Sequence, residues 1–207
     1  MKRKIQSRNV GGSLALVIVF TLVITSCQKT NLGPGLSDDY SPLTESKVIP
    51  TPDVPEIIAV PGGNKVIWHA YATGEQIYEC QQSTTDPDLY LWVFIEPDAT
   101  LYADAAFTRE VGIHYIGPTW QATVGRKNGD FVVGTKLQSV TEDVTAIPWL
   151  LLQAVPSTDP DYYDEITYIQ RLYTVGGLAP ATAATSANVG AKEGVPYTAE
   201  YFFYGSN

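Results

Sequence analysis

The chain has 207 residues, with 13 Lys and Arg against 22 Asp and Glu, and its formal net charge is −9 at pH 7. An acidic surface of this size repels phosphate backbones, so we expect no nucleic-acid partner. It also repels anionic lipid headgroups, so any membrane binding must come from another source. The length is enough for one domain with a sizeable core.

The N-terminus has the three parts of an export signal. Lys2, Arg3, Lys4 and Arg8 form a basic region, and an apolar run follows from Leu14 to Ile24. Eleven residues span only about 16 Å as a helix, which is too short for a hydrocarbon core of roughly 30 Å. This length favours a cleavable signal over a transmembrane anchor.

The apolar run ends in Ile24-Thr25-Ser26-Cys27, the pattern of a lipobox, in which the cysteine thiol is acylated and becomes the new N-terminus. Two or more acyl chains hold a protein stably on a bilayer without a transmembrane helix. We therefore expect residues 1–26 to be a lipoprotein signal peptide and Cys27 to carry the lipid; the alternative is an ordinary secretory signal whose cleavage site Cys27 happens to follow. Gln28 is not the aspartate that retains lipoproteins at the inner membrane in enteric bacteria, which favours the outer membrane of a bacterial envelope.

Residues 27–55 are expected to form the lipidated N-terminus and a flexible linker. Five prolines, two glycines and scattered Ser, Thr and Asp fill this stretch, which has no apolar periodicity. Removal of residues 1–26 leaves 9 basic residues against 22 acidic ones, so the net charge of the mature chain falls to −13. The folded domain is predicted to cover residues 56–207.

From residue 57 onward, short runs rich in β-branched and aromatic residues alternate between apolar and polar positions, as half-buried strands do. Asn128-Gly129 is typical of a hairpin turn. Residues 98–107 could form one or two turns of helix. We expect strands near residues 57–60, 65–72, 76–81, 89–95, 111–116, 119–124, 131–140, 147–155, 166–174 and 197–204. This pattern predicts an all-β fold, a single antiparallel β-sandwich or a barrel-like domain.

Six ordered blocks resemble the family catalogued as domain of unknown function 3455, which occurs in exported bacterial and fungal proteins. The resemblance runs from about Val60 to Tyr204, implies a single domain and implies no activity. The blocks are His69–Gly74, Gln76–Cys80, Gly117–Trp120, Ile147–Leu151, Tyr168–Arg171 and Val195–Tyr201. Members of this family often carry a second cysteine where this chain has Ala184, so Cys80 would lack that partner.

Cys80 is the only cysteine left if Cys27 is lipidated. We interpret it as a small buried apolar residue, with an intermolecular disulfide or a reactive thiol as the alternatives.

Two histidines could carry chemistry in the predicted domain. With a carboxylate such as Glu79, His69 and His114 could hold a divalent metal or act as acid and base. Histidines satisfied by hydrogen bonds at a strand surface are the simpler interpretation. No glycine-rich nucleotide loop, nucleophile elbow, zinc-protease motif or Cys-x-x-Cys pair occurs in the sequence, so we expect no cofactor and no metal. Whether the chain is an enzyme stays open.

The candidate binding residues are His69, His114, Trp120, Gln170 and Arg171. Tyr and Trp combine an apolar face with a polar group, which suits a small-molecule or carbohydrate ligand. Burial of Arg171 is costly without a partner. It is therefore expected either to pair with a carboxylate, Glu79 being the choice, or to face a cleft for an anionic or hydroxyl-rich ligand. The leading hypothesis is a lipid-anchored ligand-binding or envelope surface module. The alternative is an enzyme that uses His69 or His114 as acid, base or metal ligand.

Overall fold

The computed structural model describes residues 49–207. The predicted signal peptide, Cys27 as the expected lipid attachment site and the expected linker up to residue 48 lie outside the described residues. Among residues 49–207, no helix has both the length and the apolar character needed to cross a membrane.

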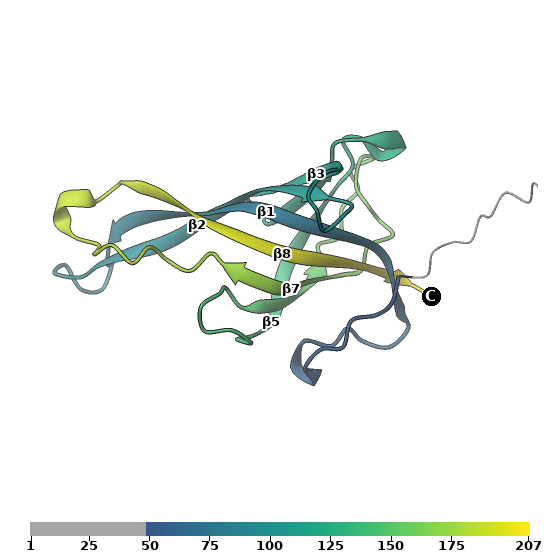
Figure 1. The fold of residues 1–207 in the computed structure, drawn as a ribbon, viewed down its shortest axis with the longest axis horizontal. Coiled ribbons are helices and arrows are strands. Elements are labelled where there is room, and N and C mark those ends of the chain that lie inside the picture. Colours follow the sequence, from purple (N-terminus) through teal and green to yellow (C-terminus); the bar gives the residue numbers. More distant parts are fainter. Residues whose placement is uncertain (1–48) are drawn as a thin grey trace, which may run out of the picture. The chain divides into compact units, whose positions relative to one another are not determined.

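The domain is a single sheet of eight antiparallel strands, each paired with its neighbours in the chain, and β1 pairs with β8 to close a barrel (Figure 1). The all-β prediction is confirmed, and of its two alternatives the barrel is correct. The strands are β1 (Asn64–Gln82), β2 (Tyr90–Tyr102), β3 (Glu110–Tyr115), β4 (Thr119–Ala122), β5 (Phe131–Val140), β6 (Trp149–Ala154), β7 (Tyr168–Gly176) and β8 (Lys192–Ser206). Three short 3-10 helices are η1 (Glu56–Ile58), η2 (Gly125–Lys127) and η3 (Ser186–Asn188).

Three strands are much longer than the others and continue past the barrel as a three-stranded extension, which we call the arm (Figure 1). The arm consists of residues 75–82 of β1, 90–97 of β2 and 192–197 of β8. In it β1 pairs with β8 on one side and with β2 on the other, where the register shifts between Ile77 and Tyr78. The segment 177–191 lies along the arm, where Thr182 O accepts a hydrogen bond from Trp92 Nε1 at 2.8 Å. The arm therefore stands over one mouth of the barrel.

β1 is one continuous strand, although the sequence predicted two, with a break near Gly74. The glycine lies where β1 and β2 approach closely, and a Cβ there would be 2.1 Å from Asp98 O. The absence of a side chain thus permits the close pairing instead of ending the strand.

The possible helix at residues 98–107 was also wrong, because residues 98–102 continue β2. Ala99 and Leu101 face the interior in a period-two pattern. The loop after β2 is organised by Asp104, whose carboxylate accepts hydrogen bonds from the backbone N–H groups of Ala106, Thr108 and Arg109. These bonds make a side-chain-stabilised turn in place of a helix.

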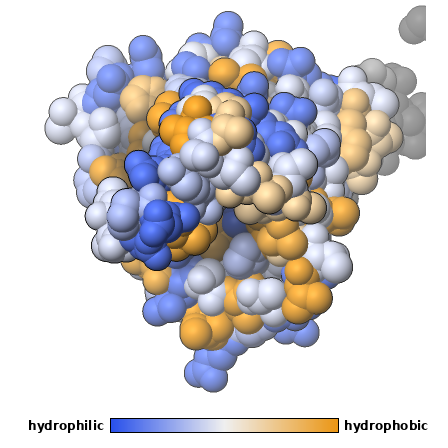
Figure 2. Space-filling model, turned by 90° about the vertical axis from the view of Figure 1, so that its left-hand side faces the viewer, coloured by the Kyte–Doolittle hydropathy of each residue, from blue (hydrophilic) through white to orange (hydrophobic). Residues whose placement is uncertain are grey.

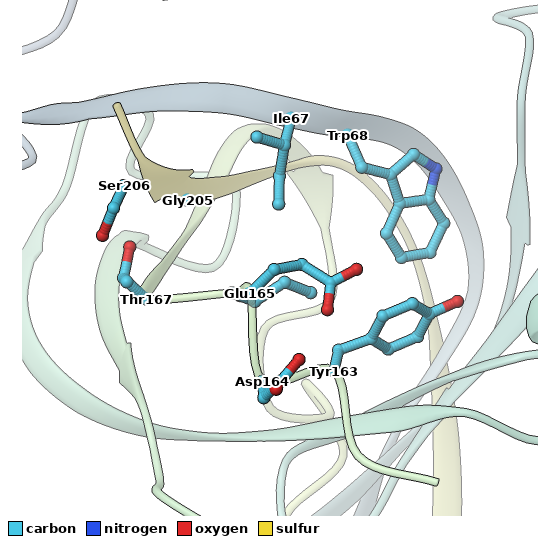
Figure 3. Close-up of a pocket in the computed structure, with 9 residues that line it drawn as sticks. Ile67, Trp68, Tyr163, Asp164, Glu165, Thr167, Gly205 and Ser206 are labelled. Atoms are coloured by element: carbon cyan, nitrogen blue, oxygen red, sulfur yellow. The ribbon is translucent and has the colours of Figure 1, made fainter.

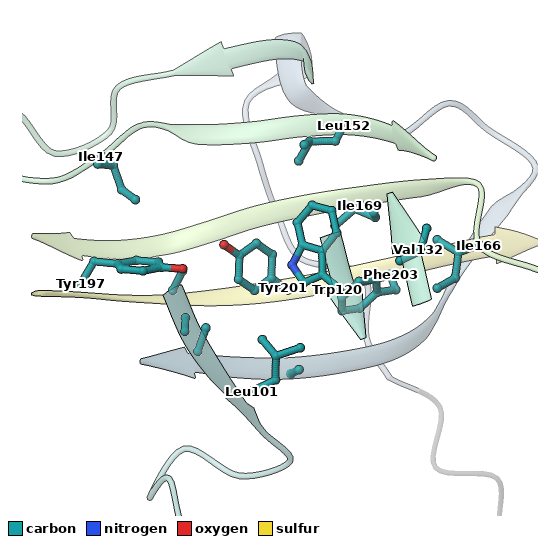
Figure 4. Close-up of a cluster of buried hydrophobic side chains, with 14 of the residues drawn as sticks. Leu101, Trp120, Val132, Ile147, Leu152, Ile166, Ile169, Tyr197, Tyr201 and Phe203 are labelled. Atoms are coloured by element: carbon teal, nitrogen blue, oxygen red, sulfur yellow. The ribbon is translucent and has the colours of Figure 1, made fainter. Parts of the chain in front are cut away.

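Aromatic side chains fill the barrel interior. Trp120, Tyr201 and Phe203 are each at most 1% exposed and pack together, with Trp120 and Tyr201 ring centroids 5.3 Å apart (Figure 4). Gly134 on β5 lies beneath this cluster, where a Cβ would be 3.0 Å from the ring of Trp120. The large rings occupy space that small residues on neighbouring strands leave free, including Ala70, Ala72 and Ala99.

The segment before β1 covers part of the outer wall of the barrel. Ile58 in η1 is fully buried there with Leu151, Leu172 and Phe202, and Ile49 and Val54 pack against the same cluster. The expected strand at 57–60 is therefore a 3-10 turn, η1, and the expected linker does not extend to residue 55, because residues 49–55 already lie on the domain.

A short relay of hydrogen bonds fixes this segment to the wall. Gln170 Nε2 donates to Ile58 O at 2.7 Å, and Gln170 Oε1 accepts from Tyr204 OH at 2.5 Å. Both polar ends of the buried Gln170 are satisfied in this way.

Candidate ligand-binding site

The mouth of the barrel beneath the arm contains a cavity of about 300 Å³, to which every one of the eight strands contributes. Figure 2 views the molecule from the arm end, where hydrophilic and hydrophobic residues surround a recess near the centre of the face. The lining residues are Gln76, Phe94, Ile95, Pro97, His114, Gly117, Pro118, Trp120, Lys136, Leu150, Leu152, Arg171 and Tyr201. We call this cavity the arm-end pocket.

The β3–β4 hairpin supplies two of these side chains. His114 and Trp120 are directly opposite each other in the antiparallel register, so both point into the barrel. Gly117 in the connecting turn has a φ of 129°, a value that glycine adopts without strain. The two rings stack with centroids 4.4 Å apart and planes 8° from parallel.

His114 is neutral because of its surroundings. Its pKa is lowered from 6.5 to about 3, chiefly by burial and also by the positive charge of Arg171, although a hydrogen bond to Thr119 O acts in the opposite direction. That bond joins Nδ1 to the carbonyl oxygen at 2.8 Å. A carbonyl can only accept, so Nδ1 carries the proton and Nε2 is left as an acceptor.

Arg171 enters the same pocket from β7, opposite Tyr201 on β8. Its Nε and Nη2 donate to Pro148 O at 3.2 and 2.8 Å. Within residues 49–207, no carboxylate lies within ion-pair distance of its guanidinium. The expected pairing with Glu79 is therefore wrong. The charge of Arg171 instead acts on its neighbours, since it lowers the pKa values of Tyr78 and Tyr201 against the raising effect of burial.

Several polar groups in and beside the pocket are buried without a hydrogen-bond partner. They are Gln76 Nε2, Trp120 Nε1, Tyr201 OH and, deeper toward the arm, Tyr197 OH. Figure 4 shows Trp120, Tyr201 and Tyr197 in a row along the barrel. Gln76 and Tyr201 each lie close enough to Tyr197, and Arg171 close enough to Tyr201, for a side-chain hydrogen bond that affects the tyrosine pKa values. The indole N–H of Trp120 has no such neighbour, and an unsatisfied buried donor costs about 1–3 kcal/mol.

Not all of the predicted binding residues meet in this pocket. His114, Trp120 and Arg171 line it, whereas His69 and Gln170 do not. Gln170 is directed to the opposite face of β7 from Arg171, because consecutive residues of a strand alternate. His69 lies on the outer wall, where it stacks on Phe202 and where its Nε2 is 2.8 Å from Glu200 Oε2. The single cleft containing all five residues is therefore wrong.

The sequence analysis missed three polar residues of the pocket: Gln76, Lys136 and Tyr201. Gln76 and Tyr201 belong to the blocks that carry the family resemblance, which was the available signal. Lys136 is exposed on β5 and had no signal of its own.

A second cavity, of about 580 Å³, lies at residues 163–167 and the ends of β1 and β8 (Figure 3). Trp68 and Tyr163 form one side, and the carboxylates of Asp164 and Glu165 lie near them. None of the buried unpartnered polar groups found in residues 49–207 belongs to its lining. We therefore place the candidate site in the arm-end pocket. No cluster of three or more His, Cys, Asp or Glu residues suited to a metal ion occurs within residues 49–207.

The protein is a closed antiparallel β-barrel with a small, partly apolar pocket at one mouth. Residues 61–205 match the model of the family described as a protein of unknown function, DUF3455, and the chain belongs to that family. Searches of curated proteins and of solved structures find no significant match to the chain.

Proposed function

We propose that this protein is a binding module of the bacterial envelope, anchored by lipid on Cys27, that takes a small molecule into the arm-end pocket. The anchoring rests on the lipobox pattern at Ile24–Cys27, and the outer membrane as its location rests on Gln28. The binding role rests on one observation above the others. The buried indole N–H of Trp120 has no acceptor and borders a partly apolar pocket, which the polar side chains of Gln76 and Tyr201 also line.

The size of the pocket limits the ligand. A volume of about 300 Å³ corresponds to roughly ten water molecules at about 30 Å³ each. A ligand, or the part of one that enters, therefore has on the order of ten non-hydrogen atoms. Such a compact pocket with apolar walls and a few fixed polar groups is the usual form of a small-molecule site.

The geometry supports binding more than acid–base catalysis. A histidine with a pKa of about 3 is a weak base at neutral pH, so His114 is poorly matched to general-base work. His69 is paired with Glu200 on the outer wall and lines a different cavity from His114. The two histidines therefore do not form one catalytic site.

The test is a thermal-shift screen of the purified domain with benzoate, benzamide, benzylamine and methyl glucoside. Binding at a hundred times Kd stabilises a protein by about 2.7 kcal/mol, enough to raise the melting temperature by about 5 °C or more. Leu150→Trp should block the pocket, whereas Leu137→Trp, on the exposed part of β5, should not.

We expect at least one compound to stabilise both the wild type and Leu137→Trp but not Leu150→Trp. Trp120→Phe, which keeps the ring stacking and removes the donor, should weaken binding and serves if Leu150→Trp does not fold. The proposal fails if none of the four compounds stabilises the wild type, or if stabilisation is unchanged in both pocket variants.

A further inference from the structure

The charged side chains that line the arm-end pocket are all positive. Arg171 and Lys136 line it, and its lining contains no Asp or Glu. This is unexpected by composition, because the chain has 22 acidic residues against 13 basic ones. The bias therefore belongs to the pocket and not to the surface as a whole.

Arg171 has hydrogen-bonding capacity left over. A guanidinium carries five N–H donors, and the contacts with Pro148 O engage only Nε and Nη2. Apart from a side-chain contact with Tyr201, its remaining N–H groups are available to another acceptor. Arg171 is half-buried, and no carboxylate nearby neutralises its charge. The planar carboxylate of a ligand would match a guanidinium in two parallel hydrogen bonds.

Three other polar groups of the pocket can also donate hydrogen bonds. Trp120 Nε1 and Gln76 Nε2 can only donate; Trp120 Nε1 has no acceptor, and Gln76 has only the oxygen of Tyr197 nearby. The phenol of Tyr201 can donate as well. The side chains facing the space thus offer donors and positive charge, which suits a ligand rich in acceptors.

His114, in contrast, offers the ligand a hydrogen-bond acceptor. Because Nδ1 of His114 donates to Thr119 O, the Nε2 of the neutral ring accepts. A ligand hydroxyl can donate to it. The remaining walls are apolar, formed by Phe94, Pro118 and Leu152 among others.

We propose that the ligand of the arm-end pocket is a small hydroxylated organic acid, whose carboxylate is held by Arg171 and whose apolar body lies against Trp120. This assignment rests on the binding role proposed above and specifies the ligand class. A carboxylate is favoured over a phosphate because one arginine fork matches two oxygens, and Lys136 is an exposed residue at the rim.

Isothermal titration with matched probes tests the assignment. Benzoate carries the charge, benzamide is its neutral counterpart of the same shape, benzylamine is the cation and phenyl phosphate is the alternative anion. We expect benzoate to bind the wild type at least tenfold more tightly than each of the other three. The tightest of the three hydroxybenzoates should in turn bind more tightly than the methylbenzoate substituted at the same ring position.

Variants identify the residue responsible. Arg171→Gln should reduce the affinity for benzoate at least tenfold and leave benzoate and benzamide within about threefold of each other. Arg126→Gln, on the exposed η2, removes the same charge outside the pocket and should keep the full preference. Arg171→Lys keeps the charge and serves as the second variant if Arg171→Gln does not fold.

Equal binding of benzoate and benzamide, tighter binding of phenyl phosphate, or an unchanged preference in Arg171→Gln would overturn the carboxylate assignment while the binding role stands. If no hydroxybenzoate binds more tightly than the methylbenzoate substituted at the same ring position, the hydroxyl group is not part of the ligand class. Failure of all probes to bind would instead count against the binding role itself.

Discussion

Replacing His114 with glutamine should flatten the loss of stability that the wild-type domain shows on acidification. The pKa of His114 is about 3 in the folded protein, against 6.5 for an unperturbed histidine. Between these values the unfolded chain binds a proton that the folded chain does not, so stability falls as the pH drops below about 6.5. The loss is close to 1.4 kcal/mol per pH unit, or about 2.5 kcal/mol between pH 7 and pH 4.5.

Urea unfolding followed by circular dichroism across this range measures the effect. The range avoids most of the contribution of Asp104 and Asp143, whose pKa values are lowered from 3.8 by hydrogen bonds from nearby backbone and threonine groups. Glutamine can still donate to Thr119 O but does not titrate, so the variant should lose about 2.5 kcal/mol less than the wild type over the same interval. Equal losses in the two proteins, or a His114 resonance that titrates near pH 6.5, would refute the reasoning.

Three further predictions concern other parts of the chain. Ile58→Ala should lower the free energy of unfolding by about 2–5 kcal/mol, because it leaves a cavity under η1. Urea unfolding measures this change, and a loss below about 1 kcal/mol would contradict the packing of that segment. Mass spectrometry should find diacylglyceryl on Cys27 in the wild type and an unacylated precursor in Cys27→Ser, and an unmodified mature N-terminus elsewhere would contradict the anchor. Ala184→Cys should form a disulfide with Cys80, because the Sγ of Cys80 lies 3.7 Å from the backbone oxygen of Thr185, the residue after Ala184. Closing a loop of roughly 100 residues should raise the free energy of unfolding by up to about 4 kcal/mol. Two thiols that stay free under oxidising conditions would contradict this prediction.

Much of the barrel could be predicted from alternation along the chain. The expected strand at residues 131–140 coincides with β5, and those at 111–116 and 119–124 correspond to β3 and β4. Closure of the sheet could not be predicted, because the pairing of β1 with β8 joins opposite ends of the domain. Local patterns do not report such long-range contacts.

The expected division of β1 into strands near residues 65–72 and 76–81 was wrong for a related reason. A glycine in a strand marks either an interruption or a close approach, and only the position of Asp98 on β2 distinguishes them. Cys80 is fully buried and forms no disulfide within residues 49–207, which confirms its interpretation as a small buried residue.

The candidate site was predictable only in part. Arg171 and Trp120 stand out by residue type, and the structure places them in one pocket. Gln170 could have been excluded from the start, because adjacent residues of a strand face opposite sides. The side of the barrel to which His69 points could not be predicted, since an irregularity between Val66 and Trp68 shifts the register of β1 against β8.

The indole N–H of Trp120 reports most directly on whether the arm-end pocket binds a small acid. It is buried and has no acceptor, whereas the indole N–H of Trp92 already donates to Thr182 O and serves as an internal control. In a ¹H–¹⁵N correlation spectrum, saturating benzoate should shift the Trp120 indole signal strongly and leave that of Trp92 in place. An unmoved Trp120 signal at saturating benzoate, or equal shifts of the two indoles, would contradict the account.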